Sequence, residues 1–292
     1  MDQRIADLIG LLELEPLEVN LFRGASRDIG SPQVFGGQVL GQALMAASRT
    51  VERRIVHSLH AYFLRRGDFD APIVYHVDRS RDGHSFSNRR VVAIQHGEQI
   101  FNMTASFQIE ESGLEHQFTM PAVPPPESLA DSSRVPAELL ARLPERVRRL
   151  LETPRPFEFR SVQQIDHFKP ATAAPAREIW FRAVSAVPDD QTLQRCLLAY
   201  VSDFYLLETA TLPHGISSLS GRAIVASIDH AMWFHRPLRI DDWLLYAVES
   251  PSASGSRGFA RASVFARDGR LVASTAQEGL VRLVARGADD AR

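Results

Sequence analysis

The heptapeptide HAYFLRR at His60–Arg66 has a near copy, HAMWFHR at His230–Arg236, 170 residues later. The similarity continues in the same order along the chain, with Ser85–Arg89 aligned to Arg257–Arg261, Gly97 to Gly269, and Thr104–Ala105 to Ala276–Gln277. Each copy has the pattern strand, strand, turn, strand. A repeat of this length is too long for a solenoid unit. The sequence therefore predicts two related domains in one chain.

Composition excludes several classes of protein. The formal net charge of the 292 residues is -2, which does not favour binding to nucleic acid or to an anionic membrane. Cys196 is the only cysteine, so there is no intrachain disulfide framework and no cysteine-based zinc site. We find neither a secretory signal after Met1 nor a run of about 20 apolar residues for a membrane span. We expect a cytoplasmic protein.

The first copy contains helical and strand patterns in succession. Ile5, Leu8, Ile9 and Leu12 recur at helical spacing after Asp2, a suitable N-cap. Gly36 and Gly37 then begin a helix of small residues, which we expect to pack closely against a sheet. Strands are predicted at 55–64, 72–81, 84–96 and 99–109, with turns at Asp82-Gly83 and His96-Gly97.

The second copy follows a segment of different character. Pro121–Pro126 is proline-rich and extended, and Pro136–Leu151 predicts a helix that Pro144 interrupts. We interpret 116–156 as a connector. Beyond it the pattern predicts strands at 157–166 and 177–187 and a long helix from Asp189 to Thr209. Four more strands are predicted at 223–235, 243–251, 257–267 and 270–283.

A buried helix followed by long antiparallel strands, twice over, predicts an α+β fold of the hotdog type in each half. In that arrangement a curved sheet wraps around one helix. We expect a double hotdog whose two sheets join into one continuous antiparallel sheet. The predicted domains are an N-terminal hotdog at 1–115, the connector at 116–156, a C-terminal hotdog at 157–286 and a tail at 287–292.

Three polar positions in the second copy are candidates for chemistry. Asp203 is the one acid in an otherwise apolar helical stretch, and a buried carboxylate needs hydrogen-bond donors, a raised pKa or a function. A partly exposed position or a structural hydrogen bond is the alternative. Ser227 and Gln277 lie on predicted strands, where ordinary strand residues are the alternative. Together the three side chains could hold and polarise one water molecule.

Several blocks of this sequence closely resemble the acyl-CoA thioesterase II family, the double-hotdog hydrolases often called TesB. The blocks are Phe35–Ala43, Val56–Arg65, Ile228–Arg236 and Ser274–Gly279, and the resemblance extends from about Leu11 to Arg282. It implies hydrolysis of acyl-CoA to a free acid and CoA in fatty acid metabolism, without metal or cofactor. It also implies that the family's aspartate, hydroxyl residue and glutamine are Asp203, Ser227 and Gln277. Ser227 stands where the family has threonine.

The chemistry of thioesters fits these residues. A thiolate leaves readily because thiols ionise near pH 8.5, so a weak base that positions water is enough. Backbone N–H groups at Gly36 and Gly37 are candidate donors to the oxyanion. His57 is a possible pocket residue. His57 and His60 are three apart on a strand and point to opposite faces, which argues against a metal site.

Two other functions stay open. One is a hotdog hydratase or dehydratase acting on acyl thioesters, and the other is an acyl-CoA-binding protein without activity. The family resemblance also leads us to expect a homodimer or homotetramer. Copy one has Ala105 where copy two has Gln277, and its helix offers only the neutral Gln38 and Gln42. We therefore expect one active site per chain.

Overall fold

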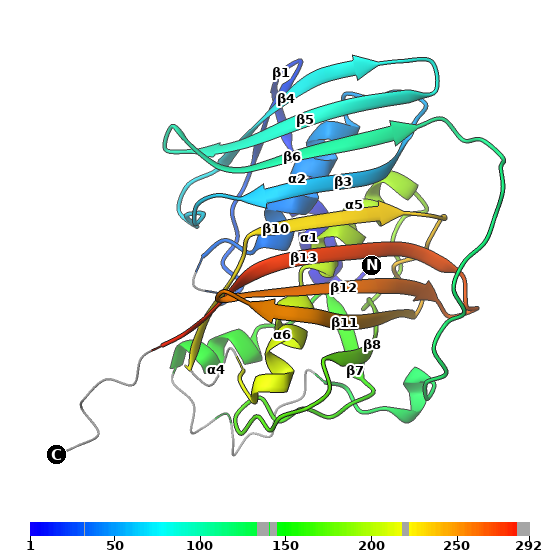
Figure 1. Cartoon of the computed structure of the whole chain (residues 1–292). Coiled ribbons are helices and arrows are strands. Elements are labelled where there is room, and N and C mark those ends of the chain that lie inside the picture. The colour runs from blue at the N-terminus through cyan, green and yellow to red at the C-terminus, as the bar shows by residue number, and fades with distance from the viewer. Residues whose placement is uncertain (32, 133–139, 141–144, 218–221, 285–292) are drawn as a thin grey trace.

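The computed structural model describes all residues except 32, 133–139, 141–144, 218–221 and 285–292. In this described part of the chain thirteen strands form one antiparallel sheet (Figure 1). From one edge to the other the order is β1 (Glu15–Glu18), β2 (Leu21–Gly24), β4 (Ile73–Asp82), β5 (Phe86–Gln95), β6 (Glu98–Gln108), β3 (Ile55–Phe63), β10 (Asp229–Phe234), β13 (Leu271–Leu283), β12 (Arg257–Ala266), β11 (Leu244–Ser254), β8 (Ala176–Ala183) and β7 (Phe157–Ser161). β9 (Ala223–Ser227) pairs with β13 outside this path.

The order of strands reads the same from both edges toward the centre, as two copies related by a two-fold axis require. The halves meet at β3 and β10, which pair antiparallel from Tyr62 with Asp229 to Ser58 with Trp233. The sheet curves around the central helices α2 (Gly36–Ser48) and α5 (Gln191–Ser202) (Figure 1). This confirms the predicted double hotdog with one continuous sheet.

The glycines of α2 face the other central helix. A Cβ on Gly37 would lie 2.1 Å from the backbone oxygen of Tyr200, and one on Gly41 would lie 3.2 Å from that of Cys196. These contacts run in opposite directions along the chain, so the two helices are antiparallel. The close approach that the small residues predicted is therefore to α5, although α2 also packs on strands of its own half.

The start of the chain completes the core of the first half. α1 (Gln3–Leu12) begins at Asp2, whose carboxylate accepts from the N–H of Arg4, and it buries Ile5, Leu8 and Leu12 as predicted. The hairpin of β1 and β2 was not predicted from the sequence. Its four-residue strands are too short to show a clear alternation, and β2 extends the sheet by pairing with β4.

Residues after β6 pass along the second half of the sheet before the chain enters it (Figure 1). The indole N–H of Trp180 donates to the carbonyl of Pro124 at 2.9 Å, and Trp180 packs in a small apolar cluster with Trp243 and Phe265. A 3-10 turn, η1 (Pro126–Ser128), follows. The predicted helix at 136–151 falls partly outside the described residues, and its described part is α4 (Glu145–Glu152).

Several predicted boundaries in the second copy were wrong. The strands predicted at 157–166 and 177–187 end earlier, at residues 161 and 183. The predicted helix 189–209 is two helices, because α5 ends at Ser202 and α6 (Leu206–Thr211) starts after a break, followed by the turn η2 (Leu212–His214). Tyr205 lies in the break with a φ of 70°, a left-handed conformation that cannot continue a helix. Asp203 is therefore at a helix end.

The repeat alignment was also one residue out of register in its first two blocks. His60 is exposed on the outer face of β3, whereas His230 is 0% exposed on the inner face of β10, so the two cannot be equivalent. The burial patterns of β5 and β12 coincide when Phe86, not Ser85, is aligned with Arg257. Side chains alternate along a strand, so a shift of one residue exchanges the faces.

Candidate active site

Asp203, Ser227 and Gln277 meet in the second half and form what we call the Asp203 cluster. Asp203 is the C-cap of α5, Ser227 is the last residue of β9, and Gln277 is on β13. The Nε2 amide of Gln277 donates to Oδ1 of Asp203 at 2.7 Å and to Oγ of Ser227 at 2.9 Å. The Ser227 hydroxyl donates to the same Oδ1 at 3.3 Å. The three predicted residues thus form a closed hydrogen-bonded triangle.

Burial is the dominant influence on the Asp203 carboxyl. It raises the pKa of Asp203 from 3.8 to about 6, while the bonds from Gln277, Ser227 and the backbone N–H of Gly37 act in the opposite direction. An ordinary aspartate is fully ionised well below neutral pH. The Asp203 carboxyl instead exchanges its proton near pH 6. A group that transfers protons is most effective when its pKa lies near the working pH, here close to neutral. A raised pKa in a cluster of polar side chains is typical of a functional site.

A β-bulge puts Ser227 on the inner face. Ser227 pairs with Gly279 and Ala231 pairs with Ala276, so three residues from Ile228 to His230 lie opposite two residues of β13. The extra residue ends β9 and lets side chains three positions apart, Ser227 and His230, both face inward. Without the bulge, the strand alternation would point Ser227 away from Asp203.

The N-terminus of α2 brings the first half to the cluster. A Cβ on Gly36 would lie 2.6 Å from Oδ2 of Asp203 and 3.0 Å from the ring of Phe63, so any other residue there would displace the carboxylate. A narrow pocket of about 60 Å³ opens beside these atoms and is lined by Gly36, Phe63 and Ser227 together with apolar and polar residues of the first half, Arg65 among them. Oδ2 therefore faces the junction of the two halves.

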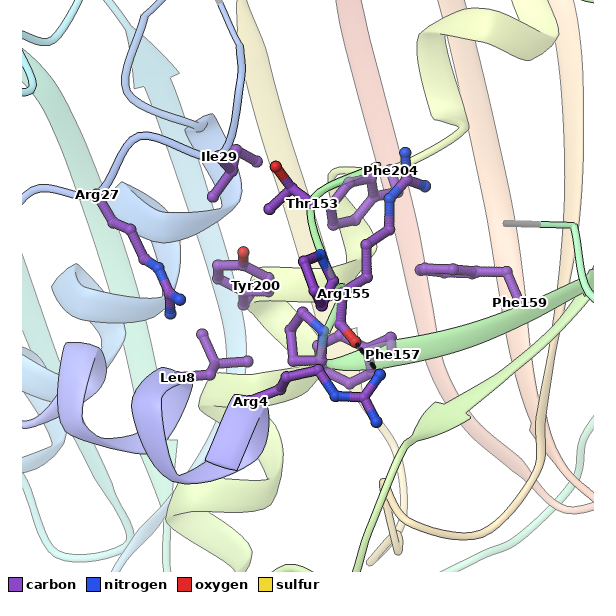
Figure 2. A pocket seen from close by; sticks show the side chains of 12 residues that line it. Arg4, Leu8, Arg27, Ile29, Thr153, Arg155, Phe157, Phe159, Tyr200 and Phe204 are labelled. Carbon is purple, nitrogen blue, oxygen red and sulfur yellow. Dashed lines mark hydrogen bonds between the residues drawn. The ribbon is translucent and has the colours of Figure 1, made fainter. Parts of the chain in front are cut away.

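A second narrow pocket, also of about 60 Å³, lies beside the last turn of α5 (Figure 2). Its walls include Tyr200 and Phe204 of the α5 end and Phe157 and Phe159 of β7, and Arg27 reaches toward it from the opposite side (Figure 2). The ring of Phe35 packs on Phe204 with centroids 4.5 Å apart and on Tyr200 at 5.2 Å. Phe35 directly precedes Gly36, so this aromatic pocket adjoins the Asp203 cluster.

The corresponding position in the first half lacks this chemistry. Ser48 ends α2 as Ser202 ends α5, and the residue after it, the C-cap, is Arg49 where the second half has Asp203. Arg49 donates to the carbonyl of Leu14. Ala105 is completely buried in β6 at the place of Gln277.

The two α2 glutamines have structural partners. Nε2 of Gln42 donates to the carbonyls of Leu11 and Ala25, and Oε1 accepts from the Tyr75 hydroxyl at 2.7 Å. Oε1 of Gln38 accepts from the backbone N–H of Arg27 at 3.2 Å. Both side chains therefore hold the segment that leads into α2.

His57 lies apart from the cluster in its contacts. Its Nε2 is 2.8 Å from Oγ of Ser106, and its ring packs edge-on against Phe86. Within the described residues no group of three or more histidine, cysteine, aspartate or glutamate side chains is arranged to hold a metal ion. None of the described helices combines the length and apolar character that crossing a membrane requires.

The sequence did not reveal a buried polar chain behind Asp203. The ring of His230 is 3.0 Å from Oγ of Ser202, and the Tyr246 hydroxyl donates to the Ser202 carbonyl at 2.8 Å and contacts Thr275 at 3.0 Å. From the sequence we placed His230 in the repeat and predicted no function for its side chain. A histidine on an inward-facing strand position next to Gln277 is the signal that could have identified it.

Comparison with known proteins agrees with this architecture. Residues 24–108 match the family model described as the acyl-CoA thioesterase N-terminal domain, and residues 147–280 match that described as acyl-CoA thioesterase. The chain is 45% identical to acyl-CoA thioesterase 2 of Haemophilus influenzae, covering 97% of this chain and 99% of that protein. It is 40% identical to human acyl-coenzyme A thioesterase 8, with coverages of 97% and 91%.

Solved structures give the same result. The crystal structure of the acyl-CoA thioesterase II TesB2 from Mycobacterium marinum is 42% identical and has a TM-score of 0.77, covering 96% of this chain and 98% of that one. A tesB protein from Mycobacterium avium subspecies paratuberculosis is 32% identical, with a TM-score of 0.78 and coverages of 95% and 99%. The resemblance inferred from the sequence is confirmed, and this chain belongs to the acyl-CoA thioesterase family.

Proposed function

We propose that this protein hydrolyses acyl-CoA thioesters to a free acid and CoA, and that Asp203 is the general base. The observation that carries the proposal is the Asp203 carboxylate, which Gln277 and Ser227 hold in place and whose pKa burial raises to about 6. Family membership supports the reaction, and the geometry supports the residues.

The triangle divides the work between its members. The amide nitrogen of Gln277 donates both of its hydrogens within the triangle. The Ser227 hydroxyl also donates its one hydrogen there. A reacting water therefore donates to Asp203, through Oδ2 on the Gly36 side, and to the free lone pair of Ser227. Gln277 and Ser227 orient the carboxylate. This differs from the expectation that all three side chains contact the water directly.

The reaction then balances without a covalent enzyme intermediate. The water oxygen bonds to the thioester carbonyl carbon as its proton passes to Asp203. The C–S bond of the tetrahedral intermediate breaks, and the leaving sulfur of CoA takes the proton back from Asp203. Gly36 and Gly37 begin α2, where the N–H groups of a helix start favour negative charge. The N–H of Gly37 already bonds to the Asp203 carboxylate, so of the two expected oxyanion donors Gly36 remains the proposed one.

The aromatic pocket of Figure 2 suits the acyl chain because the rings of Phe157, Phe159, Tyr200 and Phe204 form one part of its wall, and it adjoins the cluster through Phe35. Ile29 lines it far from the triangle in sequence. Ile29→Trp should fill the pocket, lowering kcat/KM for long acyl-CoA while leaving acetyl-CoA hydrolysis within about twofold. An equal loss for both substrates would show that the acyl chain lies elsewhere.

We propose one active site per chain. Arg49, Ala105 and the occupied Gln42 leave the first half without a base or a free amide at the corresponding place. Titration with a tight-binding thioester analogue should give one equivalent per chain. Two equivalents, or turnover that survives in Asp203→Ala/Gln277→Ala, would mean that the first half has its own site.

We also propose that the chain forms a homodimer or homotetramer through the outer face of the sheet. That face exposes three aromatic side chains near the central seam, Tyr62 at 54%, Phe86 at 43% and Trp233 at 37%. A patch of this kind typically marks an interaction surface. Light scattering at micromolar concentration should give a multiple of the 32.6 kDa chain mass, and a stable monomer would contradict the proposal.

The activity is tested by measuring thiol release from a chain-length series of saturated acyl-CoA substrates. Release that depends on Asp203 supports hydrolysis. A hydratase or dehydratase releases no thiol from a saturated substrate, and a non-catalytic binding protein shows saturable binding without release.

A further inference from the structure

Two hydrogen-bond acceptors beside the Asp203 cluster lack a partner among the described residues. They are Oε1 of Gln277 and Nδ1 of His230, and both side chains are 0% exposed. Leaving a buried polar atom unpaired costs about 1–3 kcal/mol. Native proteins rarely keep such atoms unsatisfied, so each of these two acceptors needs a donor.

The two acceptors belong to neighbouring side chains. Ala231 of β10 pairs with Ala276 of β13. One residue further along this antiparallel pair, His230 lies opposite Gln277. Their side chains share the inner face, since both are fully buried beneath the end of α5. Residues opposite each other in antiparallel strands have Cβ atoms about 4.5–5.5 Å apart, which leaves the two polar tips close to one another.

Hydrogen bonding determines that the unpaired ring nitrogen is an acceptor. Oγ of Ser202 donates to the carbonyl of Ala199 at 2.9 Å, so it must accept the proton of His230 Nε2 at 3.0 Å. The other ring nitrogen, Nδ1, then carries no hydrogen. Burial lowers the pKa of His230 to about 3, so the ring stays neutral at the pH values at which Asp203 titrates.

The amide of Gln277 has one orientation for the same kind of reason. Its nitrogen donates to Oδ1 of Asp203 and to Oγ of Ser227. A rotated amide would turn Oε1 toward the carboxylate, and two acceptors repel each other. Oε1 therefore points away from the triangle, and it cannot bond directly to the second acceptor, Nδ1 of His230.

We propose that one buried water molecule donates its two hydrogens to Nδ1 of His230 and Oε1 of Gln277, and that His230 is through this water a positioning residue for Gln277. Buried waters typically satisfy two to four otherwise unpaired polar groups. This water is distinct from the reacting one. It fixes the amide so that its nitrogen faces Asp203. The structural part of this inference stands alone, while the effect on rate rests on the function proposed for Asp203.

The water itself is tested by a crystal structure at about 1.5 Å resolution. Electron density for one oxygen atom within about 3.2 Å of both Nδ1 and Oε1 supports the proposal. A direct contact between the two side chains, or an empty space between them, overturns it whatever the protein's activity.

Three variants test the effect on Gln277. In His230→Asn the side-chain oxygen can occupy the place of Nδ1 and keep the water. In His230→Gln the polar tip instead occupies the place of Nε2, and His230→Phe removes both nitrogens while keeping a ring. The fold of each variant is checked by circular dichroism and thermal melting, and the Asn and Gln pair suffices if the Phe variant does not fold.

We expect the Asn variant to keep kcat within about threefold of wild type. The Gln and Phe variants should lose about tenfold in kcat, the rate equivalent of one hydrogen bond, with little change in KM because His230 does not touch substrate. A Gln277 amide that the water no longer holds also stabilises the Asp203 carboxylate less. The acid limb of their pH profiles should therefore move to higher pH, which a purely structural effect would not cause.

If the Asn, Gln and Phe variants of His230 share one kcat and one pH profile, a positioning role for His230 is refuted. Asp203→Asn measured alongside keeps this result separate from the function itself. If that variant loses turnover and the His230 variants do not, the inference fails alone. If Asp203→Asn retains turnover, the proposed mechanism fails, and the crystal structure still decides whether the water is bound.

Discussion

Replacing Asp203 by asparagine removes the proposed base and keeps the shape of the site. The asparagine oxygen can take the place of Oδ1 and still accept from Gln277 and Ser227. The remaining change is the loss of a proton acceptor, which typically lowers a rate by about 10²–10⁴-fold. We expect kcat to fall by this amount in a continuous thiol-release assay, with KM changed much less.

The wild-type pH profile should show the same group. The pKa of Asp203 is raised by burial to about 6, so kcat/KM should rise as pH increases through about 6 and then level off. The phenols packed near it do not add a second step there, because burial raises the pKa values of Tyr200 and Tyr246 well above this range. In Asp203→Asn this limb should be lost from the residual activity.

The stability of Asp203→Asn should rise although its activity falls. The rise of the Asp203 pKa from 3.8 to about 6 means that ionisation destabilises the fold, by at most about 3 kcal/mol at about 1.4 kcal/mol per pH unit. This cost is absent below pH 3.8 and complete above about pH 6. Asp203→Asn should therefore melt at a higher temperature than wild type at pH 7.5, and the difference should shrink toward pH 4.

Asp229→Asn is the matched control. Asp229 is a partly buried carboxylate two residues from Ser227, its pKa is also raised by burial, and it accepts from the backbone N–H of Glu278. An asparagine oxygen can keep that bond, so turnover should stay within about threefold of wild type. Near-wild-type turnover in Asp203→Asn would refute the mechanism. A loss of equal size in both variants would point to a structural effect.

Three further results are expected. Gly36→Ala should abolish most activity because the new methyl group lies 2.6 Å from Oδ2 of Asp203, whereas Gly10→Ala, which meets open space, should be fully active and at least as stable. Ser227→Ala and Gln277→Ala should each lose less than Asp203→Asn, about 10-fold to 100-fold, since each removes hydrogen bonds to the carboxylate and not the base, and Ser227→Thr should be active because it keeps the hydroxyl. Analytical ultracentrifugation of a Trp233→Arg variant should show weaker self-association than wild type, with activity retained if the outer face is only an interface. Wild-type kinetics for Gly36→Ala, a complete loss in Ser227→Ala, or unchanged assembly in Trp233→Arg would each contradict the corresponding argument.

The sequence alone determined the class of fold and predicted three residues that the structure brings together, Asp203, Ser227 and Gln277. The repeated order of strands predicted two copies, and antiparallel pairing with a helix inside each curve is the arrangement that buries both apolar faces. Asp203 could be identified because an acid in an apolar helical stretch needs a reason to be there. These inferences depend on local periodicity and on the cost of burying charge, and both can be read from neighbouring residues.

The tertiary structure decided how those residues meet. The bulge after Ser227 and the left-handed Tyr205 are single-residue irregularities, which hydrophobic patterns do not show. They move Ser227 to the inner face and Asp203 to a helix end. The one-residue error in the repeat alignment has the same origin, because matching letters at His60 and His230 say nothing about which face each occupies.

The contact between the halves was also beyond the sequence. Gly36 approaches Asp203 across 167 positions of the chain. The acceptors of His230 and Gln277, which have no partner in the described part of the chain, become neighbours only through strand register. Helical and strand periodicity act over a few residues, whereas register and helix packing are set by how all the apolar surfaces fit together. The sequence thus predicted Asp203, Ser227 and Gln277, and the tertiary structure decided how these side chains and Gly36 lie around the carboxylate.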